Sequence, residues 1–176
     1  VKDGGASTFL DLPIDPPDAN LMKTTLEIDL TGEEPVARGT IEAHGANAVY
    51  LRSSLEDPER RDEIFEKQLA SDYPGAKLVS ARYQNLTNLE APTKISFAFK
   101  SEQLLRRDGA REFLLPMAED KDLLGAYAKQ STRTQDLTIR VPFANETKVK
   151  YTLSSDRVFD RIPEPVQIDS KFGSLK

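Results

Sequence analysis

The chain has 176 residues, 24 Lys and Arg against 29 Asp and Glu, a net charge of -5 and no cysteine. This length suffices to bury the core of one large domain, or of one domain with a short attachment. The negative charge argues against a nucleic-acid partner, and no apolar run approaches the roughly 18 residues of a membrane span. Without cysteine, the chain has no disulfide, no thiolate metal ligand and no cysteine nucleophile.

The first 20 residues predict an edge strand and a linker. Residues 7–14 favour a strand that pairs at a sheet edge, and residues 15–20 contain two prolines, which lack a donor and restrict the preceding residue. We therefore expect residues 1–20 to join a preceding domain to a second domain over residues 21–176. Because the chain lacks an initiator Met and a signal-peptide pattern, we expect it to be a piece of a longer protein.

Residues 25–43 predict a β-hairpin. Leu26, Ile28 and Leu30 alternate with polar residues, as in a half-buried strand. A turn over residues 31–35 then leads to a second strand over residues 37–43. The inward residues of this second strand are small, so we expect a bulky group to pack over them.

A helical segment interrupts the strand pattern. Residues 46–56 favour a short helix, and a second helix is predicted to begin with Asp57 as N-cap and Pro58 as its first residue. Ile64, Phe65 and Leu69 form an apolar stripe that is typical of a packed helix face. Pro74 and Gly75 are predicted to end this helix.

The rest of the chain reads as strands and turns. Alternating residues predict strands with Val79, Ala81 and Tyr83 on one face and with Ile95, Phe97 and Phe99 on another. Further strands are predicted at residues 112–116, 137–141, 149–153, 158–162 and 166–173. A turn is predicted at 107–109, and a short helix or irregular crossover at 117–130.

These elements predict a mainly β (α+β) fold. Eight or nine strands at near-hairpin spacing, without regular alternation of strands and helices, favour an antiparallel β-sandwich of about eight strands. The short helical insertion lies around residues 46–73 and covers a face or an end of a sheet.

The sequence contains no evident catalytic constellation. His44 is the single histidine, so a catalytic triad or a multi-histidine metal site has no second histidine to draw on. Its place at a strand end beside Gly45 favours a solvent-facing or capping role. We predict no catalytic, cofactor-binding or metal-ligating residue and no cofactor.

Three groups of charged or polar residues have ordinary explanations. The carboxylates of Glu33-Glu34, Asp15 with Asp18, and Glu119-Asp120-Asp122 fall in predicted turns without the spacing of a calcium loop. Arg106, Arg107 and Arg111 flank a hairpin turn, where they are either solvated or available to an anion or a partner carboxylate. The Asn-x-Thr sequons at Asn85 and Asn145 matter only in a eukaryotic secreted protein.

The order of several short motifs resembles the region C-terminal to the papain-like core in large bacterial transglutaminase-like proteins. The matching segments are residues 16–20, 45–52, 73–78, 85–86 and 163–173. Those proteins commonly carry an N-terminal β-domain of unknown function as well. Phe9-Leu10-Asp11 resembles the end of such a core, where an aspartate orients the histidine. However, Leu12-Pro13 replaces the usual Pro-Thr, which favours Asp11 as a linker residue.

The resemblance implies a noncatalytic structural or interaction domain of an exported bacterial protein, periplasmic or at the cell surface. Its expected partners are the neighbouring domains of the same polypeptide, with no nucleic acid and no membrane span. The alternative is a carbohydrate- or peptide-binding β-sandwich, which requires exposed aromatic residues on one sheet face. A hydrolase would need His44 close to a serine, or paired carboxylates in a cleft.

Overall fold

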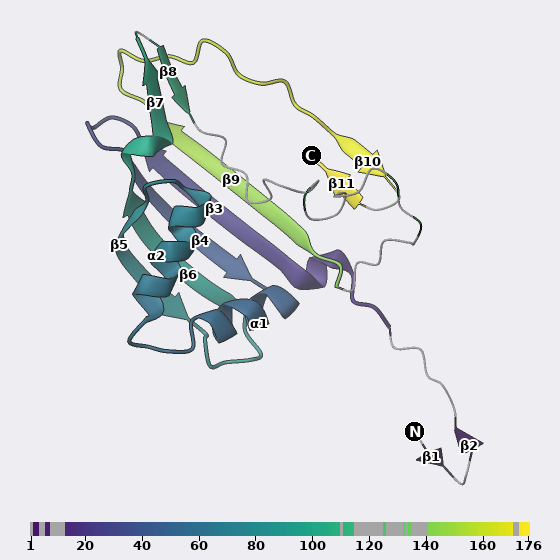
Figure 1. Ribbon diagram of the computed structural model, residues 1–176. Helices are drawn as coiled ribbons and strands as arrows, with labels where there is room; N and C mark the ends of the chain where they lie inside the picture. The colour runs from purple at the N-terminus through teal and green to yellow at the C-terminus, as the bar shows by residue number, and fades with distance from the viewer. Residues whose placement is uncertain are drawn as a thin grey trace.

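The computed structural model describes residues 2–3, 6–7, 13–109, 111–114, 125, 132, 134, 141–170 and 173–176. Its centre is a five-stranded sheet with the order β5-β6-β4-β3-β9, and two helices lie on one face of it (Figure 1). The strands are β3 (Leu21–Asp29), β4 (Val36–Ala43), β5 (Lys77–Gln84), β6 (Thr93–Lys100) and β9 (Ala144–Thr152). The helices α1 (Gly45–Ser54) and α2 (Arg61–Asp72) connect β4 to β5.

The predicted hairpin is confirmed as β3 and β4, which pair antiparallel. Leu26 and Ile28 are buried, whereas Lys23 and Glu27 on the opposite face are exposed. Bulky side chains pack over the small inward residues of β4, as predicted. A Cβ atom at Gly39 would lie 2.7 Å from both Leu26 Cδ2 and Phe97 Cζ, so these side chains occupy the space that glycine leaves.

Helix α1 is confirmed, but α2 begins later than predicted. The Asp57 carboxylate accepts a hydrogen bond from the Glu59 N–H at 3.0 Å, which closes a turn before the helix, and α2 starts at Arg61. Asp57 is therefore not the N-cap. The predicted end is correct: the Tyr73 N–H bonds to the Leu69 carbonyl at 2.7 Å, and Gly75 follows with a φ of 73°.

The apolar stripe of α2 is part of the core. Phe65 is buried and meets the Phe97 ring edge-on at a centroid distance of 5.3 Å and the Tyr83 ring at 6.0 Å. Leu69 is also buried, and Ile64 packs against the cluster. The helix is held on the sheet by an aromatic cluster, as the periodicity predicts.

Strand β5 departs from simple alternation. Its register against β6 shifts between Leu78 and Ser80, so an extra residue is inserted at Val79. Leu78, Ala81 and Tyr83 pack against the core, while Val79 is 58% exposed. The prediction that Val79 shares a face with Ala81 and Tyr83 is wrong because the bulge turns Val79 outward.

The fold is mainly β with two helices, as predicted, but the sheet is mixed. Strand β9 pairs with β3 in parallel along its whole length, so a purely antiparallel arrangement is wrong. The other strands form three two-stranded sheets: β1 (Lys2–Asp3) with β2 (Ala6–Ser7), β7 (Leu105–Asp108) with β8 (Arg111–Leu114), and β10 (Ile168–Ser170) with β11 (Gly173–Leu175). Among the described residues, no second sheet packs face to face on the first.

The predictions for the segments after β6 are confirmed in part. The predicted hairpin is confirmed as β7 and β8, but its turn begins at Gly109, because Arg107 and Asp108 pair within β7. Residues 158–162, predicted as a strand, are irregular. Apart from isolated positions, the predicted crossover at 117–130 and the strand at 137–141 lie outside the described residues, as do residues 8–12.

One side chain ties three distant segments together. The buried Asn20, at the end of the 3-10 turn η1 (Pro17–Asn20), accepts the Ala46 N–H at 2.8 Å and donates to the Pro142 carbonyl at 2.9 Å. Its backbone carbonyl accepts a hydrogen bond from the Asn47 side chain at 2.7 Å. Asn20 therefore caps α1 and anchors the entry to β9, a role that the sequence pattern did not reveal.

Candidate functional site

His44 makes a polar contact with a carboxylate at the surface. It is the residue before α1, and its Nε2 atom is 3.1 Å from Glu42 Oε1. The other carboxylate oxygen of Glu42 lies 3.9 Å from Lys94 Nζ. The described residues place no serine hydroxyl against the His44 ring and contain no group of three His, Cys, Asp or Glu side chains suited to a metal ion. His44 is the N-cap residue of α1, and its carbonyl accepts the Asn47 and Ala48 N–H groups, but its side chain forms no capping hydrogen bond.

The basic hairpin is engaged by a carboxylate of this chain. Glu112 receives Arg107 Nε at 3.0 Å and Arg157 Nε at 3.0 Å. Arg157 also donates to the Leu30 carbonyl at 2.6 Å. These contacts pin β8 and the segment after β9 to the end of β3, whereas Arg106 and Arg111 are solvent-exposed.

The predicted carboxylate groups do not converge. Glu34 pairs with Lys100 at 3.0 Å, while Asp15 and Asp18 are exposed near η1. Glu119, Asp120 and Asp122 lie outside the described residues, as does Asp11. No calcium-like set is assembled by the carboxylates that are described.

The two sequons occupy different settings. Asn85 has a φ of 60° and its side chain donates to the Pro92 carbonyl at 2.9 Å. The loop that it opens is held by Arg52, which donates to the Asn88 carbonyl at 2.8 Å and to the Ala91 carbonyl at 2.6 Å. Asn145 lies within β9. Asn85 therefore already has a structural role.

The groups with shifted pKa values have local structural causes. Burial and the hydrogen bond from the Tyr83 hydroxyl to Asp62, at 2.8 Å, raise the pKa of Tyr83. Hydrogen bonds from the Thr31 side chain and backbone lower the pKa of Asp29. The hydrogen bond from Lys67 lowers the pKa of Glu63. Each of these three shifts involves a hydrogen bond that also holds a turn or a helix in place.

A hollow of about 410 Å³ lies between the helices and the sheet. Its lining includes Met22 and Ile41 from the sheet, Leu69 and Gln68 from α2, and Tyr50 from α1. Tyr50 is 60% exposed, whereas most of the aromatic rings around the hollow belong to the core. The lining is mainly apolar with a few polar groups, which is the composition of a small-ligand or peptide site.

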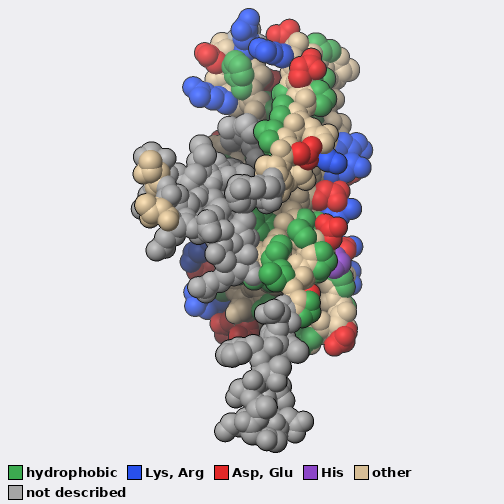
Figure 2. Space-filling model, turned by 90° about the vertical axis from the view of Figure 1, so that its right-hand side faces the viewer, with side chains coloured by type: hydrophobic (Ala, Val, Ile, Leu, Met, Phe, Trp, Pro, Cys, Tyr) green, Lys and Arg blue, Asp and Glu red, His purple; other side chains and the backbone are tan. Residues whose placement is uncertain are grey.

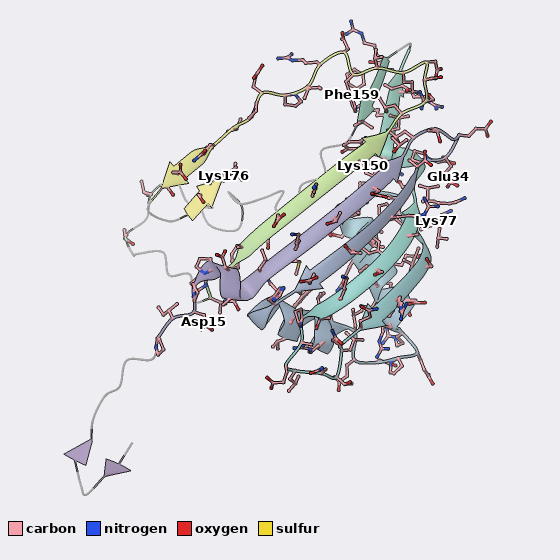
Figure 3. All side chains as sticks on the ribbon, turned by 180° about the vertical axis from the view of Figure 1, so that it is seen from behind. Asp15, Glu34, Lys77, Lys150, Phe159 and Lys176 are labelled. Atoms are coloured by element: carbon pink, nitrogen blue, oxygen red, sulfur yellow. The ribbon has the colours of Figure 1, made fainter. Side chains whose placement is uncertain are left out.

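The opposite face of the sheet is open and strongly charged. We call it the helix-free face; it faces the viewer in Figure 3 and is seen edge-on at the right of Figure 2. Its basic side chains are Lys23, Arg38, Lys77, Arg82, Lys94, Lys100, Lys148 and Lys150, and its carboxylates are Glu27, Asp29, Glu42 and Glu146. Eight positive against four negative charges give this face a net charge of +4, although the whole chain carries -5.

The carboxylates of the helix-free face are all engaged. Glu146 pairs with Lys23 at 3.5 Å, Glu27 with Lys150 at 3.8 Å and Glu42 with Lys94 at 3.9 Å. Asp29 accepts two hydrogen bonds from Thr31. Lys100 pairs with Glu34, which lies outside the five strands. Within the described part of the chain, the remaining cations Arg38, Lys77, Arg82 and Lys148 form no ion pair.

No protein-family model and no curated protein matches the chain. In the described residues, no helix combines the length and the apolar character that a membrane crossing requires. The resemblance to the region beyond a transglutaminase-like core therefore remains a prediction. Two of its marks, residues 16–20 and 45–52, do lie together, since Asn20 contacts Ala46 and Asn47.

Proposed function

We propose that this chain is a noncatalytic interaction domain, C-terminal to a transglutaminase-like cysteine-enzyme core in an exported bacterial protein, periplasmic or at the cell surface. It packs on that core or shapes the access of substrates to it. The resemblance supplies the context of this proposal. The observation that carries it is the exposed apolar segment after β9, residues 158–168.

This segment presents apolar side chains to solvent. Val158 is 87% exposed and Ile162 is 73% exposed, and Val166 and Ile168 are exposed as well. The segment leaves the end of β9 and runs apart from the five-stranded sheet (Figure 1). Asp160, Arg161, Glu164 and Gln167 separate these apolar side chains. Exposed apolar side chains that recur along one segment favour a surface that another protein covers.

The segment is anchored at its base and extended beyond it. Arg157 bonds to Leu30, and the Phe159 ring meets the Tyr151 ring at a centroid distance of 6.3 Å. Pro163 and Pro165 then favour an extended backbone. Burying one Val or Ile side chain contributes about 1.5–3 kcal/mol, and three or four of them offset part of the entropy cost of docking a neighbouring domain.

Hydrogen–deuterium exchange on the isolated chain and on the parent polypeptide tests this proposal. We expect the amides of residues 158–168 to exchange fast in the chain and to be protected in the parent. The double variant Val158→Ser/Ile162→Ser should lose that protection. Leu89→Ser is the matched control, because Leu89 is 75% exposed in a loop away from the segment.

Two results would contradict the proposal. The first is equally fast exchange of residues 158–168 in the chain and in the parent. The second is a parent reading frame with an upstream domain that lacks a Cys, His and Asp core behind a signal peptide.

The predicted eight-stranded sandwich would need a second sheet against the five-stranded one. One face is occupied by α1 and α2 (Figure 1), and the helix-free face carries twelve charged side chains. Burying charges under a second sheet is costly unless each is paired. We therefore propose a single mixed sheet with one helical layer for residues 21–176 in place of the sandwich.

The hollow beside α1 supports one alternative, a carbohydrate- or peptide-binding module. Its partly exposed Tyr50 and apolar lining suit a short peptide better than a sugar, and no aromatic side chain lies on the helix-free face of the five strands. This alternative predicts that a bound peptide shifts the NMR signals of Met22, Ile41 and Leu69. The interaction domain predicts that peptides leave these signals unchanged.

A further inference from the structure

The middle of the helix-free face is a stripe that crosses all five strands. Cross-strand pairing aligns Arg82 with Ser96, Thr40, Thr25 and Lys148 in one row. The row has a cation at each end, three hydroxyl residues between them and no carboxylate. Strands lie about 4.8 Å apart, so the two cations start about 19 Å from each other.

A third cation without an ion pair among the described residues flanks this row. Arg38 lies two residues before Thr40 on the central strand β4, so its side chain rises on the same face. Its cross-strand partner Glu27 is paired with Lys150. Arg38, Arg82 and Lys148 thus surround a hydroxyl-lined centre. Arg38 is close enough to Asp29 to lower the pKa of that carboxyl, but none of the three cations forms an ion pair among the described residues.

We propose that the helix-free face docks an acidic protein surface, with Arg38, Arg82 and Lys148 as its main charge contacts. This rests on the proposed function, since it names the partner chemistry of the interaction domain. The carboxylates of the partner pair with the three cations and accept hydrogen bonds from the Ser and Thr hydroxyls between them. Complementary charge raises the association rate and selects the partner.

The composition of the face favours protein over other polyanions. Glu27, Glu42 and Glu146 lie among its cations, and they would repel a continuous phosphate backbone. The row offers no aromatic ring for base stacking. It also offers no large apolar side chain to enter a bilayer. A protein surface, by contrast, presents isolated carboxylates that can match isolated cations.

Fluorescence anisotropy with a fluorescein-labelled poly-L-glutamate peptide of twelve residues tests the proposal on the full chain. We expect saturable binding at low salt that weakens about tenfold or more as the salt concentration approaches 0.2 M, because surface charges are screened over about 10 Å. The triple variant Arg38→Glu/Arg82→Glu/Lys148→Glu should lose binding at least tenfold.

A matched control separates the face from bulk charge. The variant Arg60→Glu/Lys67→Glu/Arg106→Glu changes the net charge by the same amount away from the face and should keep most of the affinity. The neutral variant Arg82→Gln/Lys148→Gln, which introduces no new repulsion, should lose binding several-fold while its thermal melt stays near that of the parent chain.

Three outcomes would overturn the proposal. The first is no binding of polyglutamate at low salt, and the second is an equal loss of polyglutamate affinity in the two triple variants. The third is that a single-stranded DNA of twelve nucleotides or phosphatidylglycerol vesicles bind more tightly than polyglutamate. These outcomes are distinct from a failure of the proposed function. Exchange protection of residues 158–168 in the parent reports on the apolar segment, and polyglutamate binding reports on the sheet face alone.

Discussion

Phe65→Ala tests whether α2 is held on the sheet by its aromatic contacts. Phe65 is 2% exposed and packs edge-on against Phe97 and Tyr83. Removal of a buried Phe side chain costs about 3–5 kcal/mol, because transfer energy is lost and a cavity remains. The area estimate agrees: about 150–200 Å² of buried aromatic surface at 25 cal/mol per Å² corresponds to about 4–5 kcal/mol.

Urea unfolding followed by circular dichroism measures this loss. We expect the midpoint to fall with an unchanged m-value, since the surface exposed on unfolding changes little. A thermal melt should shift down by about 6–20 °C, at 2–4 °C per kcal/mol for a chain of this size. Val49→Ala, at an exposed position of α1, is the control and should stay within about 0.5 kcal/mol of the parent chain. A loss below about 1 kcal/mol for Phe65→Ala would show that the helix does not depend on this cluster.

Three further variants test local features. Gly45→Ala should cost at least 1 kcal/mol more than Gly109→Ala in urea melts. Both glycines have a positive φ, but a Cβ atom would clash with Ala19 and Asn20 only at Gly45, whereas at Gly109 it would meet nothing within 4 Å. Equal costs would contradict the close contact at Gly45. Thr93→Val should leave stability unchanged or raise it by about 1 kcal/mol, because the buried Thr93 hydroxyl has no hydrogen-bond partner among the described residues. A loss above 1 kcal/mol would contradict this. Tyr83→Phe should flatten the alkaline loss of stability. The raised pKa of Tyr83 favours the protonated phenol in the fold, so its contribution is complete below about pH 10 and is lost as the pH rises through the folded pKa. Melts at pH 8 and 10.5 that fall in parallel for Tyr83→Phe and the parent chain would refute a raised pKa of Tyr83 from burial and the hydrogen bond to Asp62.

The spacing of apolar residues predicts the buried face of an element correctly where residues close in the sequence determine that face. Ile95, Phe97 and Phe99 are buried on one face of β6, as their spacing predicts. The α2 stripe and the Pro74-Gly75 stop are likewise set by adjacent residues. These elements were predictable because each reveals its buried face within a single turn or a few strand residues.

Small shifts within an element were not predictable. Asp57 has the chemistry of an N-cap, but its carboxylate closes a turn two residues later and delays α2 to Arg61. The extra residue at Val79 fits the alternation of a regular strand, and only the pairing with β6 shows the bulge. In both cases two conformations satisfy the local pattern, and tertiary contacts decide between them.

The pairing of strands far apart in the sequence could not be predicted from local patterns. The parallel pairing of β9 with β3 brings together residues more than 100 positions apart, and hairpin spacing says nothing about such a pair. The same holds for the bond between Asn20 and the Pro142 carbonyl, which joins residues 122 positions apart. Hairpin spacing between adjacent segments favours antiparallel pairing, and it contains no signal that β9 pairs beside β3.

The net charge of the chain does not reveal the positive charge of the helix-free face. The net charge of -5 argues against anionic partners, but a strand alternates its faces with period two, so charges are sorted by position and not averaged. In β9 the outward positions include Lys148 and Lys150, while the inward ones include Val149 and Tyr151. The helical segment, residues 45–75, carries seven carboxylates against four cations on the other side of the sheet. A dipolar domain follows, with its positive face turned away from the helices. This charge asymmetry favours the orientation in which the helix-free face meets an acidic partner.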